Sequence, residues 1–190
     1  ARLAPCPPEQ IDDEIEHGLG AILTLLGASR ICWYSARQNA TTLVRVYSVS
    51  STGASPSPSL ITATDLPYTS DRLLRGETVA ISRLEDLPAA AGQDRGVFER
   101  YSVRSVAFIP SSCATENKGL LKITFPVERG WPSELLTQLD LLGNFIVATV
   151  ERKIAAEALD ESERLFRYLF EEASLGIALE NLDGRLLRVN

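Results

Sequence analysis

The sequence has 190 residues, of which 45% are apolar and 23% charged, and its formal net charge is −6. A chain of this length and composition accommodates one full globular domain and a smaller additional part. Its Lys and Arg residues form no cluster that would neutralise a run of phosphates, so we expect no nucleic-acid partner. No apolar run approaches the length of a membrane span, and no signal-peptide pattern opens the chain. We therefore expect a cytoplasmic protein without membrane insertion.

The three cysteines, Cys6, Cys32 and Cys113, are too few and too widely spaced for a disulfide framework or a zinc site. We expect no metal and no cofactor, and we interpret Cys32 and Cys113 as buried structural residues. The sequence contains no Met and stops at Asn190, immediately after a predicted strand. Both ends predict a segment of a longer protein.

The first part of the chain predicts a helix followed by a hairpin. Residues 1–8 are Pro-rich, which is typical of a disordered or extended lead-in. Residues 9–26 predict a helix because apolar residues recur every three or four positions, and Gly27 follows as a left-handed cap. Residues 30–36 and 42–50 are rich in β-branched and aromatic side chains and predict two paired strands.

The middle of the chain predicts two helices and three further strands. The helices are expected at residues 65–76 and 94–101, and the strands at 78–82, 105–110 and 119–125. Together with the first hairpin, these elements predict an α+β fold. We expect an antiparallel sheet of five or six strands with helices on its faces.

Residues 133–173 predict one long helix, which neither Gly nor Pro interrupts after Gly143. One apolar stripe, confined to its first half, is expected to pack on the sheet: Leu135, Leu139, Leu142, Ile146 and Val150. A second stripe follows the 4-3 spacing of a coiled coil and predicts a homodimer. The seam of this dimer is expected to consist of Leu141, Phe145, Ala148, Arg152, Ala155, Leu159, Phe166 and Leu169, with Ser162 in the same series.

The pattern changes again after this helix. Residues 175–179 and 185–189 predict two short strands, joined by a turn at residues 181–184 that contains Asp183 and Gly184. We expect this hairpin to open a second domain.

Several short motifs in the first 152 residues together resemble a GAF domain. In chain order they are Leu66-Pro67-Tyr68, the run from Leu73 to Val79, Asp86-Leu87-Pro88, the run from Tyr101 to Ser105, Ile109-Pro110, Gly119 and Trp131. The resemblance lies in the order and spacing of the motifs, since each one is common by itself. It implies a GAF domain over residues 9–152, with its exit helix beginning at residue 133.

The end of the chain resembles the linker and the first strands of a PAS domain. The segments that carry this resemblance are the run from Ala158 to Arg167, residues 169–173, Gly176-Ile177-Ala178, Asp183-Gly184-Arg185 and Val189-Asn190. It implies a signalling helix over residues 153–173 and the truncated start of a PAS domain over residues 174–190.

GAF–PAS pairs commonly precede histidine kinase or diguanylate cyclase domains. The resemblance implies a sensory or regulatory module of a bacterial signal-transduction protein, foremost a sensor histidine kinase of a two-component system, with no catalytic residue in this segment. A small molecule or partner would change the state of the GAF core, and the helix of a homodimer would transmit that change to the PAS and output domains. Two alternatives stay open: a structural dimerisation spacer with a filled pocket, and a GAF-fold methionine sulfoxide reductase.

A ligand pocket is expected between the sheet and residues 65–101. Tyr68, Phe98 and Tyr101 would supply aromatic walls, and Arg72 and Arg104 would supply partners for an anion. The alternative is that the aromatic side chains simply fill the core.

Other ligand chemistries of the GAF family fit the sequence poorly. His17, the only histidine, lies between the apolar positions of the first helix, which predicts a solvent-facing side chain and not a haem ligand. Phytochrome-like GAF domains attach bilin through a Cys beside a His, and no Cys neighbours His17. Asn117-Lys118 resembles part of the cyclic-nucleotide signature, but Arg129 stands where an acid is expected, and we interpret the pair as a turn. The separation of Cys32 and Cys113 does not match the clustered cysteines of the reductases.

Overall fold

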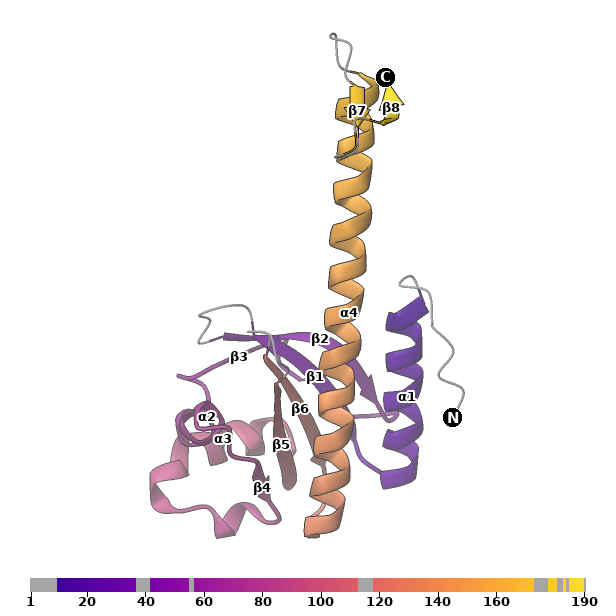
Figure 1. The fold of residues 1–190 in the computed structure, drawn as a ribbon. Coiled ribbons are helices and arrows are strands. Elements are labelled where there is room, and N and C mark those ends of the chain that lie inside the picture. Colours follow the sequence, from indigo (N-terminus) through magenta and orange to yellow (C-terminus); the bar gives the residue numbers. More distant parts are fainter. Residues whose placement is uncertain are drawn as a thin grey trace. The chain divides into compact units, whose positions relative to one another are not determined.

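The structure is a computed structural model that describes residues 10–36, 42–54, 57–112, 118–172, 178–180, 183 and 185–189. Its contacts divide the chain into two compact units, residues 1–151 and 152–190. In the first unit, helices pack on both faces of one antiparallel sheet (Figure 1).

The sheet has six strands in the spatial order β3-β2-β1-β6-β5-β4, and every neighbouring pair is antiparallel. The strands are β1 (Arg30–Ala36), β2 (Thr42–Ser50), β3 (Leu60–Thr62), β4 (Val79–Ile81), β5 (Ser105–Ser112) and β6 (Lys118–Phe125). This confirms the predicted antiparallel α+β fold. Strand β3 is not predicted from the sequence, because three residues are too few to establish an alternating pattern.

In the part of the chain that the structure describes, four α-helices accompany the sheet: α1 (Ile11–Leu26), α2 (Pro67–Leu74), α3 (Gly92–Arg100) and α4 (Ser133–Glu171), with short 3-10 turns at Leu84–Asp86 and Ala89–Ala91. Gly27 ends α1 in the left-handed conformation, with φ of 65°, as predicted. Helix α4 begins at the predicted residue Ser133 and ends at Glu171, while Ala173 lies outside the described residues.

The two faces of the sheet carry two separate cores because side chains alternate along each strand. Helices α1 and α4 cover one face (Figure 1), where Trp33, Leu121 and Ile123 pack against Leu19 of α1 and Ile146 of α4. The stripe that was expected to pack on the sheet does so: Leu139 and Ile146 are buried, and Leu135, Leu142 and Val150 pack against the same core.

The opposite face is covered by the chain between β3 and β5, including α2 and α3 (Figure 1). Its core contains Tyr34, Phe98 and Phe108, and the Phe98 and Phe108 rings lie 6.0 Å apart. Asp94 of α3, which is fully buried, accepts hydrogen bonds from the backbone N–H groups of Tyr68 (3.2 Å) and Thr69 (2.8 Å). This carboxylate therefore caps the start of α2 and fixes α2 against α3.

Two glycines permit close packing on the α1/α4 side. A Cβ at Gly119 of β6 would overlap the six-membered ring of Trp33, and a Cβ at Gly143 of α4 would overlap the hydroxyl of Ser111 on β5. Gly143 thus lets α4 approach the sheet closely at the position where the helix crosses β5.

The second unit comprises the α4 residues from Arg152 onward and a hairpin. Strands β7 (Ala178–Glu180) and β8 (Leu186–Val189) pair antiparallel and overlap the two predicted strands, while residues 175–177 of the first lie outside the described residues. Phe170 is only 3% exposed, and its ring stacks on that of Phe166 at 5.8 Å. Part of the predicted turn, residues 181, 182 and 184, lies outside the described residues.

Among the helices that the structure describes, none combines the length and apolar character that crossing a bilayer requires. The predicted lead-in at residues 1–8 lies outside the described residues.

Candidate functional site

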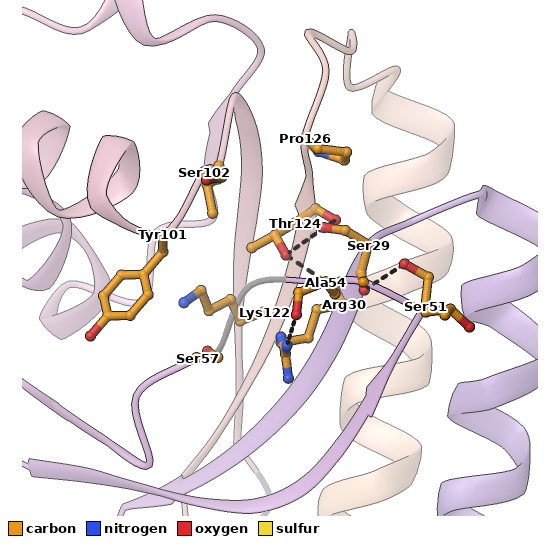
Figure 2. Close-up of a pocket in the computed structure, with 13 residues that line it drawn as sticks. Ser29, Arg30, Ser51, Ala54, Ser57, Tyr101, Ser102, Lys122, Thr124 and Pro126 are labelled. Carbon is orange, nitrogen blue, oxygen red and sulfur yellow. Dashed lines mark hydrogen bonds between the residues drawn. The ribbon is translucent and has the colours of Figure 1, made fainter.

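Two hollows meet on the α2/α3 side of the sheet. The first has a volume of about 350 Å³ and lies beside the start of β1, the end of β6 and the chain that follows β2 (Figure 2). The second has a volume of about 180 Å³ and lies between β3 and α3. Tyr101, Val103 and Lys122 line both, so the two hollows adjoin at these residues.

The first hollow is rich in hydroxyl groups. The Ser29 hydroxyl donates to the Thr124 carbonyl oxygen at 2.8 Å, and the Ser51 hydroxyl donates to the Ser29 carbonyl oxygen at 3.3 Å. These bonds, drawn in Figure 2, join Ser29, the residue before β1, to β6 and to the residue that follows β2. Arg30 of β1 lines the same hollow and donates to the Ala54 carbonyl oxygen at 3.5 Å. The walls thus offer many hydrogen-bonding groups and one guanidinium.

The second hollow is mostly apolar. Its walls consist of Pro58, Leu60, Ile61, Leu66, Val97 and Phe98, beside the shared residues. Asp65 and Arg100 also line it, and both side chains are exposed. The pair of hollows therefore has one polar side and one apolar side.

Lys122 occupies the boundary between them. It sits in the middle of β6, opposite Cys32 of β1 and Phe108 of β5, and it is 6% exposed. Its ammonium points into the first hollow on the side of Tyr101 and Ser57 (Figure 2), and it lies 5.8 Å from the centre of the Phe108 ring. Within the described residues, no hydrogen bond or ion pair engages this ammonium.

The electrostatic surroundings of Lys122 are positive. The pKa of Lys122 is lowered to about 8, chiefly by burial and in smaller part by the nearby guanidinium groups of Arg30 and Arg45, whereas Cys32 acts in the opposite direction. A cation that is buried beside two other cations and lacks an acidic partner is costly unless an anion joins it.

Ser57 and Pro58, which border the two hollows, are held by β1 and β2. The Tyr34 hydroxyl donates to the Pro58 carbonyl oxygen at 3.0 Å, and Arg45 donates to the Ser57 carbonyl oxygen at 2.7 Å. Burial raises the pKa of Tyr34, so its phenol stays protonated and keeps this bond. The described part of the loop is thereby tied to the sheet.

The predicted site residues separate into three places. Tyr101 lines both hollows and Phe98 lines the second. Tyr68 and Arg72 lie together at a third hollow of about 300 Å³ beside β4, where Arg72 pairs with Glu77 at 3.0 Å and donates to the Tyr68 hydroxyl. Arg104 is exposed and lines none of these three hollows.

The remaining candidates are dispersed. His17 is exposed on α1, as the helical spacing predicts. Cys32 is a buried free thiol whose Sγ lies 3.5 Å from the Ser48 hydroxyl. Cys6, Cys113 and Asn117 lie outside the described residues. Among the residues that the structure describes, no three His, Cys, Asp or Glu side chains gather as a metal site would require.

Lys122 and Arg30 are site residues that the sequence did not reveal. The available signal was the position of Lys122, because it is the one charged residue in the mostly apolar run of residues 119–125. A lysine in such a strand either marks a solvent-facing side or a buried charge with a function, and only the packing of α3 over this face distinguishes the two.

On α4, all eight predicted seam residues are exposed in the single chain. Leu141, Leu159 and Leu169 are 65%, 62% and 59% exposed, values far above those of the stripe that packs on the sheet. The helix therefore carries large apolar side chains that its own chain leaves uncovered.

Solved structures with a similar fold include a phytochrome domain, a sensor histidine kinase domain and a reductase. A phycoerythrobilin-bound GAF domain from a cyanobacterial phytochrome is 15% identical, with 79% of this chain and 90% of that chain covered and a TM-score of 0.65. The GAF domain of a two-component sensor histidine kinase from Bacillus halodurans is 19% identical, with 76% and 97% covered and a TM-score of 0.60. A type II free methionine-R-sulfoxide reductase from Thermoplasma acidophilum is 14% identical, with 76% and 95% covered and a TM-score of 0.58.

This chain has the GAF fold. Identities this low establish the fold and not the function, since one fold hosts many activities. No family model matches the sequence, and no curated protein matches it. The GAF unit comprises residues 1–151. The hollows around Lys122 lie on the face of its sheet that is opposite α1 and α4.

Proposed function

We propose that the chain is a sensory module of a bacterial signal-transduction protein, foremost a sensor histidine kinase. In this proposal the GAF unit binds a small molecule in the hollows around Lys122, and two copies associate through α4. The helix of the dimer transmits the bound state to a PAS domain, of which the β7–β8 hairpin is the beginning.

The uncovered stripe of α4 is the observation that carries this proposal. Soluble monomers rarely expose a long contiguous series of large apolar side chains, because such a surface is stabilised by burial. The stripe has the 4-3 spacing of a coiled coil, so in a parallel pair each residue meets its own copy. A second copy of this chain is therefore the partner whose spacing matches the stripe along its whole length.

The fold supports the sensory part of the proposal. Structures similar to the GAF unit include a domain of a sensor histidine kinase and a bilin-bound domain of a phytochrome. Signal transfer requires a cavity that can bind a ligand and a helix that continues beyond the domain, and this chain has both. A structural spacer would need the helix alone.

The reductase alternative is less well supported. Its chemistry needs a thiolate that a substrate can reach, and the one cysteine among the described residues, Cys32, is buried beneath the loop that carries Ser57. The free methionine-R-sulfoxide reductase shares the fold at 14% identity, which carries no catalytic residue across.

Light scattering at micromolar concentration tests the dimer directly. We expect the wild-type chain to have the mass of a dimer, and Leu159→Lys to shift it towards the monomer, because two like charges would meet in one layer of the seam. Glu161→Lys is the matched control, since it places the same side chain about 200° further around the helix, outside the stripe.

A monomeric wild-type mass would contradict the proposal. So would a Leu159→Lys variant as dimeric as Glu161→Lys. Circular dichroism of each variant distinguishes loss of association from loss of the helix. Residues 133–151 of α4 stay anchored on the sheet in either case, so a drop in helical signal would report unfolding of the rest of α4.

A further inference from the structure

We propose that the ligand of the GAF unit is a small organic anion with an apolar chain, whose carboxylate or phosphate group pairs with the Lys122 ammonium. This inference rests on the proposed sensory function and names the chemical class of the ligand. Two independent observations carry it: a buried cation that has no partner among the described residues and is aimed into a cavity, and an apolar hollow that adjoins it.

The first observation is the state of Lys122. Lys122 is 6% exposed, and no described group hydrogen-bonds its ammonium, so the charge has lost hydration without receiving a hydrogen bond in return. The face of the Phe108 ring, whose centre lies 5.8 Å from the ammonium, compensates only weakly. An oxyanion placed in the first hollow would supply the missing partner with a charge-assisted hydrogen bond.

The charged groups around Lys122 favour an anion over any other ligand charge. Arg30 of β1 and Arg45 of β2 act on Lys122 as additional positive charges. The buried acid of α3, Asp94, is bonded to the start of α2, and Asp65 is exposed and accepts hydrogen bonds from the Thr62 N–H (2.9 Å) and hydroxyl (2.6 Å). Neither acid has been found to bond Lys122.

Two further titratable groups, Tyr34 and Cys32, face this region. The raised pKa of Tyr34 keeps its phenol neutral at physiological pH, and Cys32 is held between the hydroxyls of Ser48 and Ser57. Tyr101 forms part of the wall that the two hollows share, beside Lys122.

The second observation is the apolar hollow. Leu60, Ile61, Leu66, Val97 and Phe98 surround a space that begins at Lys122 and Tyr101. A purely inorganic anion would leave this space unused, whereas a short alkyl chain would fill it and gain from the burial of its surface. The adjoining hydroxyl-rich hollow receives the polar end.

The experiment takes advantage of the small number of lysines in the sequence, which are Lys118, Lys122 and Lys153. The chain is labelled with 13C at lysine Cε, and the three NMR signals are followed while acetate, hexanoate, hexyl phosphate or hexan-1-ol is added. Lys122→Met assigns the signal and removes the cation with little change of shape. Lys118→Met is the matched control, since Lys118 is the exposed first residue of the same strand.

We expect the Lys122 signal to move with hexanoate or hexyl phosphate, and its pKa to rise from about 8 by roughly one unit or more, since a bound anion favours the ammonium. Affinity is expected to increase roughly fourfold for each methylene group between acetate and hexanoate. It is expected to fall as the pH rises through 8, because the neutral amine no longer attracts the anion. Lys122→Met should lose at least about tenfold in affinity, while Lys118→Met should bind as the wild type does.

Comparison of hexanoate with hexyl phosphate tells which oxyanion the site prefers. The proposal is overturned if the Lys122 signal and its pKa do not respond to either anion, or if hexan-1-ol binds as tightly as hexanoate. These measurements use the wild-type chain, so they decide the matter even if Lys122→Met does not fold. A dimer without anion binding would leave the α4 proposal standing and remove only the ligand class.

Discussion

At Gly119 the main chain of β6 passes directly beneath the indole of Trp33. Trp33 is 1% exposed and belongs to β1, which pairs with β6. Its six-membered ring occupies the space in which any side chain at residue 119 would begin. The glycine is therefore required by close packing, not by its backbone conformation.

Gly119→Ala is expected to destabilise the chain by about 1–3 kcal/mol, because the rigid ring of Trp33 has no room to move away. Gly20→Ala in α1 is the matched control: nothing lies within 4 Å of its added Cβ, so helix propensity should stabilise it by up to about 1 kcal/mol. Urea unfolding of the three proteins measures both effects. Equal stability of the two variants would show that the ring yields easily.

At the scale of elements, the β7–β8 hairpin differs from the strands of the GAF unit. Two short strands bury little surface, and an isolated hairpin of this size is marginal in water. Among the side chains that the structure describes in the same unit, Phe170 of α4 is the buried aromatic one. The hairpin is thus expected to depend on a single aromatic anchor.

Amide hydrogen exchange tests this dependence. We expect the amides of β7 and β8 to exchange at least about a hundredfold faster than those of β5 and β6, because local opening of the hairpin costs much less than global unfolding. Phe170→Ala should accelerate exchange in the hairpin further and leave β5 and β6 unchanged. Tyr168→Ala, at a 64% exposed position, is the control that should alter neither. Equal protection of both pairs of strands in the wild type would contradict the prediction.

At the scale of the whole molecule, one element belongs to both units. Helix α4 contributes residues 133–151 to the GAF unit and residues 152–171 to the second unit. The 4-3 spacing of the seam continues from Leu141 to Leu169 without interruption. Under the proposed function, the rotation of this helix about its own axis carries the signal from the ligand-binding unit to the domains that follow.

Insertions after Glu157 test that connection in the full-length protein with its proposed kinase output. Seven added residues make almost two whole turns and preserve the stripe, so regulated autophosphorylation is expected to persist. Four added residues rotate the downstream helix by about 40° and disturb the coiled coil, which should lock or scramble the output. If both insertions left the activity and its regulation equally intact, the helix would be a passive tether.

The sequence by itself determined the elements whose patterns are local. Strands β1 and β2 have the predicted bounds, and α4 begins at the predicted residue, because alternation, helical spacing and capping are visible in consecutive residues. The expected sheet and the two stripes of α4 follow from the same patterns. Phe98 and Tyr101 were also predicted near a cavity, since they lie in the segment that crosses the sheet.

The tertiary structure alone decided the composition of the candidate site. Lys122 becomes a buried cation only because β6 lies between β1 and β5 and the α2–α3 segment closes over that face. The same packing places Tyr68 and Arg72 at a different hollow from Tyr101, although all three lie in one predicted segment. Strand β3, likewise, exists through its pairing with β2. These features depend on contacts between residues that are distant in the sequence, and burial and charge proximity are properties of such contacts and not of local patterns.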